Sequence, residues 1–185
     1  MATPSSEHFT TKLSDHRYWI EKGFDLHQGA CAVQELVIQW FHDARADLGL
    51  EPTIANKGEI RPGITDIYLL LMGYAAECFL KARLIRKLLR SSKGHRFASL
   101  SIPKKVKTHS IKQLCLEIEL PLTSREARVV SLLEEAVVWG GRYPTPVSPA
   151  QLKPRMFSES DFDGARKLLQ RFMPRNKSGA AIPNI

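Results

Sequence analysis

The sequence predicts an all-α protein of about five helices in a single domain. Its 185 residues suit one domain, and 43% hydrophobic residues are enough for a substantial core. Apolar residues recur at helical spacing in several segments, whereas no segment shows the alternating pattern of a strand. We therefore expect one helical domain over residues 14–174, between flexible segments at residues 1–13 and 175–185.

The first helix is expected to start at Asp15 and to run to Ala46. Its second part carries an apolar stripe at helical spacing, formed by Val33, Leu36, Val37, Trp40 and Phe41. Gly23 and Gly29 interrupt the first part. Because glycine is a poor helix former, we expect a break or bend near these two residues. A connection rich in glycine and proline follows over residues 49–65.

A long central helix is predicted from Thr65 or Asp66, either of which can cap it, to about Arg90. At about 100° per residue, its core stripe consists of Ile67, Leu71, Tyr74, Cys78, Ala82, Ile85 and Leu89. Glu77 and Lys81 fall within this stripe, where a charge is costly unless it is paired. We expect these two residues to pair with each other and with further polar groups. The alternative is that Lys81 extends to the rim of the stripe and Glu77 meets water.

Two shorter helices are predicted after a basic loop. The first spans residues 110–119, before Pro121. Thr123 and Glu126 form the sequence signature of a capping box for the second, which the glycine pair at 140–141 should end.

A last helix is expected to start after Ser160, which can cap it, and to run through Phe172. Asp161 and Asp163 lie in its first turn, where carboxylates interact favourably with the helix dipole. That interaction is a sufficient reason for their position, and we assign them no chemistry.

No membrane contact, metal or other cofactor is predicted. The longest apolar run, residues 67–76, is about half of the roughly 20 residues that span a bilayer. The N-terminus lacks the basic start and apolar centre of a secretory signal, so we expect a cytoplasmic location. Cys31, Cys78 and Cys115 are far apart in apolar helical patterns, which favours buried thiols over disulfides or a zinc site.

The positive charge is concentrated in one part of the chain. The net charge is +8, and the segment from Lys81 to Lys107 carries ten cations without one acidic residue. Concentrated positive charge attracts polyanions, of which nucleic acid is the commonest in the cytoplasm. We predict that a nucleotide or RNA phosphate binds to Arg83, Arg86, Lys87, Arg90 and Lys93. The alternative is a solvated helix face followed by a soluble basic loop.

Three segments, in this order, carry a resemblance to a known family. They are GYAAECFLKARL at residues 73–84, THSIKQL at 108–114 and GGRYP at 140–144. Together they resemble the HEPN family, the helical domain named for higher-eukaryote and prokaryote nucleotide binding, and they imply its up-and-down helical bundle. The family's usual His-Asp-Leu reads His-Ser-Ile here, where Ser110 can cap the helix in place of an aspartate.

The resemblance also implies which polar residues meet. The family pattern of an alanine, a glutamate and a lysine in the central helix corresponds to Ala75 or Ala76, Glu77 and Lys81. The histidine that opens a short helix corresponds to His109. The later Arg-Tyr-Pro begins with Arg142 and Tyr143. We expect Arg142 to reach Glu77, with His109 close by, in a network that is either structural or functional.

Three hypotheses for function remain open. The favoured one is a HEPN-like module that binds a nucleotide or RNA phosphate and acts with a partner protein in a toxin–antitoxin or defence system. The resemblance implies a nucleotidyltransferase-type protein as that partner. The second is a metal-independent endoribonuclease. Many HEPN proteins use an arginine and a histidine separated by four to six residues, and four residues separate Arg90 from His95. The third is a non-catalytic structural interaction module. The resemblance also implies a homodimer.

Overall fold

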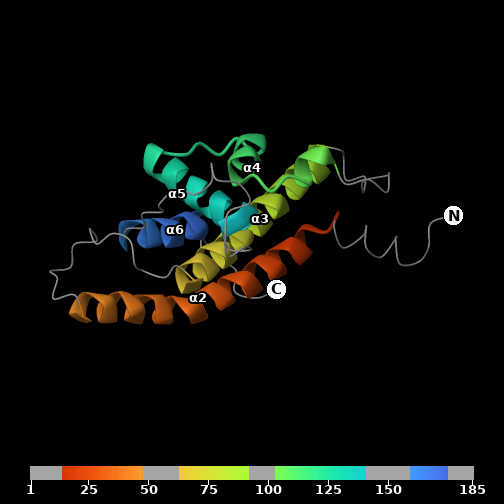
Figure 1. Ribbon diagram of the computed structural model, residues 1–185. Coiled ribbons are helices and arrows are strands. Elements are labelled where there is room, and N and C mark those ends of the chain that lie inside the picture. The colour runs from red at the N-terminus through yellow and green to blue at the C-terminus, as the bar shows by residue number, and fades with distance from the viewer. Residues whose placement is uncertain (1–13, 48–62, 92–102, 141–158, 175–185) are drawn as a thin grey trace.

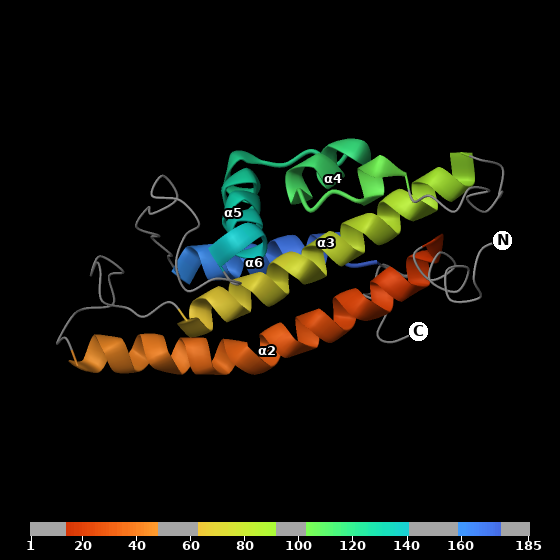
Figure 2. The same ribbon diagram turned by 45° about the vertical axis from the view of Figure 1, so that its right-hand side comes forward.

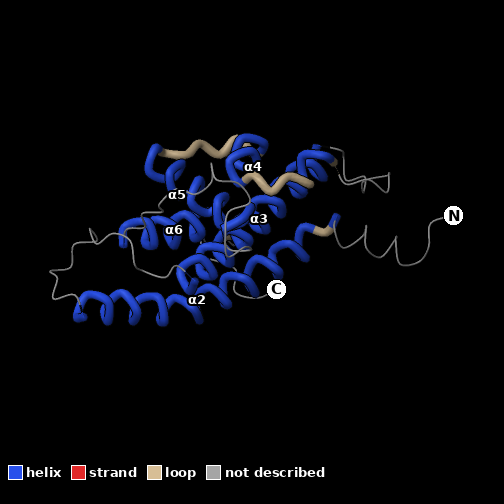
Figure 3. The backbone as a smooth tube through the Cα atoms, in the orientation of Figure 1, coloured by secondary structure: helices blue, strands red, loops and turns tan. Residues whose placement is uncertain are grey.

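The computed structural model describes residues 14–47, 63–91, 103–140 and 159–174, and these residues form an all-helical structure with no strand among them (Figures 1 and 3). The α-helices are α2 (His16–Asp47), α3 (Gly63–Ser91), α4 (Ile111–Glu117), α5 (Ser124–Glu135) and α6 (Glu159–Phe172). A 3-10 turn, η1 (Lys104–Val106), precedes α4, and a π-helical turn, η2 (Ala136–Gly140), continues α5. The predicted all-α class is confirmed, and no described helix is long and apolar enough to cross a membrane. The segments predicted to be flexible, 1–13 and 175–185, lie outside the described residues.

The helix α3 lies at the centre of the structure. It runs antiparallel to α2, and the two helices lie side by side over much of their length (Figures 1 and 2). The shorter helices α4, α5 and α6 gather on the other side of α3 (Figure 2). Helix α3 therefore has neighbours on both sides.

Because of these neighbours, the buried residues of α3 extend well beyond one stripe. Leu69, Ala76 and Leu80 are buried although they lie outside the predicted stripe, and Ile67, predicted to be in the core, is 47% exposed. The prediction for Ile67 was wrong, and the single predicted stripe missed the other buried residues because such a stripe suits a helix that is covered from one side only. The remaining core comes mainly from residues of α4, α5 and α6, namely Ile111, Leu114, Cys115, Val129, Val130, Leu133, Ala165, Leu168, Leu169 and Phe172.

Helix α2 continues through Gly23 and Gly29 as one helix, so the expected break there was wrong, although its axis curves along its length (Figures 1 and 2). A Cβ atom at Gly23 would lie 2.6 Å from Cε1 of Phe79, so this glycine allows α2 and α3 to approach closely. Gly73 has the same role on the other side of α3, because a Cβ atom there would lie 2.5 Å from Cγ2 of Val137 in η2. Burial of Phe79 and Val137 in these contacts offsets the low helix propensity of glycine.

Two predicted caps of the shorter helices are confirmed. The Ser110 hydroxyl accepts a hydrogen bond from the backbone N–H of Gln113 and caps α4. Thr123 and Glu126 form a complete capping box at the start of α5, with both reciprocal hydrogen bonds present. Both motifs depend on residues within three positions of each other, which is why the sequence alone predicts them.

Two other predicted caps were wrong, because the helices begin earlier than expected. Helix α3 begins at Gly63, so Thr65 lies in its first turn, where its side chain is buried and its Oγ1 has no hydrogen-bond partner within the described residues. Helix α6 begins at Glu159, so Ser160 is already inside it. The C-terminal end of α4 also differs from the prediction, since this helix ends at Glu117, two residues before the predicted end.

Candidate functional site

The C-terminal half of α3 presents four cations along one side of the helix. Arg83, Arg86, Lys87 and Arg90 are three or four residues apart, so they follow one another along the helix surface. Arg90 lies in the last turn, where a positive charge interacts favourably with the helix dipole. Ile118 and Leu120, from the turn after α4, face these cations and are partly buried against the core.

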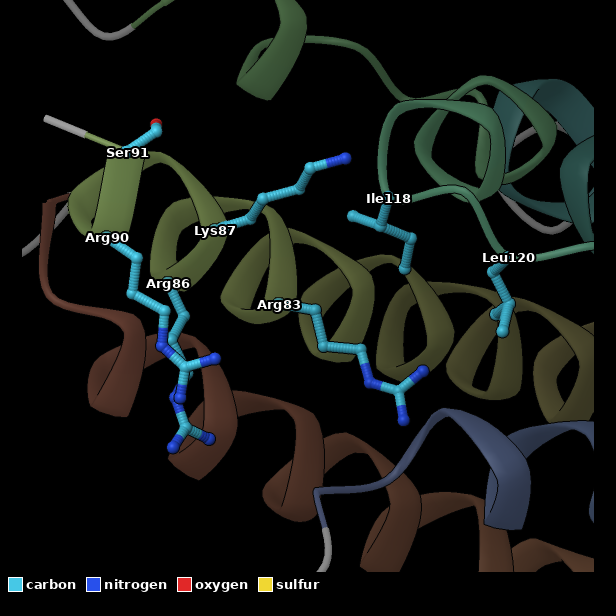
Figure 4. A pocket seen from close by; sticks show the side chains of 7 residues that line it. All are labelled: Arg83, Arg86, Lys87, Arg90, Ser91, Ile118 and Leu120. Atoms are coloured by element: carbon cyan, nitrogen blue, oxygen red, sulfur yellow. The ribbon is translucent and has the colours of Figure 1, made fainter.

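These residues line an open groove of about 620 Å³ (Figure 4). Its lining consists of Arg83, Arg86, Lys87, Arg90, Ser91, Ile118 and Leu120. The structure thus brings together four of the five residues for which we predicted phosphate binding. The fifth, Lys93, lies outside the described residues.

Two of the four cations in the groove are held by other parts of the protein. Arg83 donates a hydrogen bond from Nη2 to the carbonyl oxygen of Arg171 at 3.3 Å. The Lys87 Nζ lies 2.7 Å from Oε1 of Glu119 and also donates to the carbonyl oxygen of Glu117 at 3.0 Å. These contacts fix the two side chains and neutralise the charge of Lys87.

The other two cations are exposed. Within the described part of the chain, the side chains of Arg86 and Arg90 have no hydrogen bond or ion pair. Figure 4 shows both extending from the same side of α3, whereas Lys87 points toward the turn that carries Ile118. The pKa of His16 on α2 is lowered chiefly by burial, and the charge of Arg86 lowers it further, against the opposing effect of Asp15. The groove therefore carries positive charge that the described residues leave uncompensated.

A second polar cluster lies further toward the N-terminus of α3, and its centre is a buried ion pair. Glu77 and Lys81 are each 4% exposed, and Oε1 of Glu77 lies 2.7 Å from Nζ of Lys81. The Lys81 ammonium group also lies 5.0 Å from the centre of the Trp19 ring, a cation–π geometry. The alternative in which Lys81 reaches the rim and Glu77 meets water is therefore wrong.

His109 completes this cluster from the segment before α4. Its Nδ1 lies 3.1 Å from each carboxylate oxygen of Glu77, so a protonated Nδ1 donates to the carboxylate. The side chain of His109 is 60% exposed. Arg142 and Tyr143 lie outside the described residues, so the pairing of Arg142 with Glu77 stays a prediction. The same holds for His95, the proposed catalytic partner of Arg90.

Two carboxylates tie helices together in ways that sequence reasoning missed. Oε1 of Glu134 in α5 accepts from the Ser110 hydroxyl and from the backbone N–H of Lys112, both at 2.8 Å, and so completes the cap of α4. Asp161 is buried and accepts two hydrogen bonds from Arg128 at 3.1 Å, so its role exceeds the dipole interaction that we assigned to it. No local signal marks these contacts, since the partners are more than 20 residues apart.

Two of the three thiols are buried and have raised pKa values. Cys78 and Cys115 are buried as predicted, and burial raises the pKa of Cys78 to about 12 and that of Cys115 to about 11. Cys31 is exposed, which contradicts its predicted burial. Among the described residues, no three His, Cys, Asp or Glu side chains are grouped so that they could hold a metal ion.

Comparisons with protein-family models, with curated proteins and with solved structures found no significant match for this chain.

Proposed function

We propose that this protein is a HEPN-like helical module that binds the phosphates of RNA or of a nucleotide in the groove beside the C-terminal half of α3. The observation that carries the proposal is the position of Arg86 and Arg90, which line the groove without an acidic partner among the described residues. Arg83 and Lys87 line the same groove. As part of the same proposal, the module forms a homodimer and acts beside a nucleotidyltransferase-type partner in a toxin–antitoxin or defence system.

The proposal rests on the electrostatics of the groove. Arg86 and Arg90 are four residues apart on α3, a spacing at which like charges repel by about 0.2–0.5 kcal/mol. An anion bound between them removes this repulsion. Guanidinium groups match phosphate oxygens in bidentate geometry, and each phosphate of RNA that is neutralised also releases counterions. Phosphate groups are therefore the ligands that this pair of arginines suits best.

The side chains that line the groove predict little selectivity for base sequence. Its described lining includes no aromatic side chain on which a base could stack. Ile118 and Leu120 provide only an apolar wall beside the cations. We expect affinity to depend on the number of phosphates more than on the bases.

The test is binding of a labelled single-stranded RNA of 12 nucleotides, measured over a series of salt concentrations. Replacing Arg86 and Arg90 together by glutamine should weaken binding about tenfold or more at low salt. It should also reduce the slope of log K against log salt by about 1.4, since each phosphate contact contributes about 0.7 for single strands. Nucleoside triphosphates, used as competitors, show whether the preferred ligand is a polymer or a nucleotide.

The matched control removes two exposed cations elsewhere, with Lys22→Gln and Lys112→Gln in one variant. It changes the net charge equally but leaves the groove intact. Equal losses in the two double variants would show that binding reflects net charge alone and would overturn the proposal. Absence of binding to the folded wild-type protein would favour the structural interaction module instead.

A second candidate activity, metal-independent cleavage of RNA, is favoured by the geometry of His109. Glu77 holds Nδ1 of His109 by both carboxylate oxygens, while the imidazole remains 60% exposed. Such an arrangement orients Nε2 as a proton acceptor, which attack by a ribose 2′-hydroxyl requires.

Cleavage of labelled RNA in excess chelator tests this second candidate. Loss of cleavage with His109→Ala but not with His95→Ala would identify His109 as the general base. The reverse result would assign cleavage to the pair of Arg90 and His95. His27→Ala, on α2, is the control. Intact RNA after incubation with the folded wild-type protein would exclude this activity.

A further inference from the structure

The turn after α4 places a glutamate where glycine is usual. The backbone N–H of Leu120 bonds to the carbonyl of Cys115 at 2.9 Å and that of Glu119 to the carbonyl of Leu116 at 3.0 Å, the pattern of a Schellman motif. Glu119 occupies the left-handed position of this motif, with a φ of 57°. An L-residue is disfavoured there relative to glycine, so the backbone alone does not account for a glutamate at this position.

The side chain of Glu119 has a specific partner in the groove. Its Oε1 lies 2.7 Å from Nζ of Lys87, and this contact lowers the pKa of Glu119. Lys87 also donates to the carbonyl oxygen of Glu117, so both of its contacts lie on the same turn. The pair is open to solvent, since the side chain of Glu119 is 83% exposed and that of Lys87 is 45% exposed. A soluble anion can therefore reach Lys87.

Lys87 stands between two hollows of the surface. It lines the basic groove with Arg86 and Arg90, and it also lines a neighbouring hollow of about 410 Å³ to which Glu119 and Glu117 belong. Figure 4 shows its side chain directed toward the turn after α4 and away from the two arginines. Glu119 thus holds one of the four cations of the groove on the side of the second hollow.

We propose that Glu119 is a specificity-determining residue of the groove, whose carboxylate competes with a ligand phosphate for Lys87. This inference rests on the proposed function. A single small anion meets Arg86 and Arg90 and leaves the pair of Lys87 and Glu119 intact. A ligand with several linked phosphates reaches Lys87 as well, provided that one phosphate replaces the carboxylate. The competition therefore weakens the binding of linked phosphates, which must replace the carboxylate to reach Lys87, and leaves the binding of isolated anions unchanged.

A double-mutant cycle on Lys87 and Glu119 tests the competition, with the same 12-nucleotide RNA as probe. Glu119→Gln should tighten binding about two- to fivefold, the range that corresponds to an exposed ion pair, and should raise the salt slope by about 0.7 because one more phosphate contact forms. Lys87→Gln should raise the Kd for RNA in both backgrounds. The factor by which it raises the Kd should be at least about three times larger in the Glu119→Gln background than in the wild-type background.

The matched control is Glu117→Gln, which removes the same charge two residues away. The Glu117 carboxylate lies 3.6 Å from Lys105 and accepts from Gln113, so its loss leaves Lys87 paired. A second variant, Glu119→Gly, removes the carboxylate and also relieves the left-handed backbone. It should bind RNA like Glu119→Gln and should melt at a higher temperature than the wild-type protein, which separates effects on folding from effects on binding.

The outcomes separate this inference from the proposed function. If Glu119→Gln and Glu117→Gln tighten binding equally, or if the cost of Lys87→Gln is the same in both backgrounds, Glu119 does not compete for Lys87. In that case the proposed function still holds if the double variant with Arg86→Gln and Arg90→Gln weakens binding. If those two substitutions have no specific effect, the groove is not the binding site and both proposals fall together.

Discussion

At the scale of single residues, the buried pair of Glu77 and Lys81 shows how a charge is accommodated in an apolar environment. Burial of an isolated ion costs several kcal/mol, and an exposed pair one helical turn apart contributes only about 0.2–0.5 kcal/mol. Among the described residues, two groups partner the Glu77 carboxylate, namely Nζ of Lys81 and Nδ1 of His109. Lys81 has a second favourable contact with the ring of Trp19. These contacts join α2, α3 and the segment before α4.

We predict that Lys81→Met destabilises the protein by about 3–5 kcal/mol, because among the described residues it leaves the buried Glu77 carboxylate with His109 as its one partner. Urea unfolding followed by circular dichroism measures this loss. Replacing Glu77 by leucine in the same variant should restore most of the stability, since no unpaired buried charge then remains.

Lys167→Gln is the control for this prediction. Lys167 forms an ion pair of the same spacing with Asp163, at 2.6 Å, but its side chain is 65% exposed. Its loss should cost far less than the loss of Lys81, because solvent screens an exposed pair. A cost of similar size for Lys81→Met would mean that burial adds nothing to the energy of the pair.

At the scale of helices, local signals predict how a helix begins only where the cap is made within the helix itself. Thr123 and Glu126 cap α5 through reciprocal hydrogen bonds, and the sequence predicts both. Ser110 caps α4 as predicted, yet half of that cap comes from Glu134 in α5. The glycines of α2 and α3 illustrate the same limit, because their effect depends on the neighbouring helix.

We predict opposite effects for alanine at two helical glycines. Gly73→Ala should destabilise the protein by about 1–3 kcal/mol, because the new Cβ would lie 2.5 Å from Val137 and 3.0 Å from the carbonyl oxygen of Leu133. Gly29→Ala should stabilise it by about 0.5–1 kcal/mol, since the nearest atom, Cδ1 of Leu71, is 3.6 Å away and alanine is the better helix former. Thermal unfolding of the two variants checks both signs, and stabilisation by Gly73→Ala would contradict the close approach of α3 and η2.

At the scale of the whole molecule, four cations of a chain with a net charge of +8 meet in one groove. The C-terminal half of α3 supplies the cations, and the turn after α4 closes the other side of the groove. Self-repulsion of this charge opposes the compact state, and a polyanion that binds only the folded protein should relieve it.

We predict that inorganic tripolyphosphate raises the melting temperature by about 5–10 °C at about 100 times its Kd, as expected for a ligand that binds only the folded state. Differential scanning fluorimetry measures the shift, with sodium chloride at the same ionic strength as a control for screening. The shift should fall to less than half when Arg86 and Arg90 are both replaced by glutamine. An undiminished shift in that variant would place the anion elsewhere on the surface.

The sequence by itself determined the helical class, the capping box of α5, the contact of Ser110 with Gln113 in the cap of α4, the series of cations on α3 and the closeness of Glu77 to Lys81. All of these depend on residues within a few positions of one another, where helix geometry fixes the distance. Only the tertiary structure decided that Lys87 is neutralised by Glu119 while Arg86 and Arg90 are exposed. It also decided that α2 runs unbroken past Gly23, where Phe79 of α3 fills the space. These contacts join residues that are about 30 or more positions apart, so they exist only once the helices have packed together.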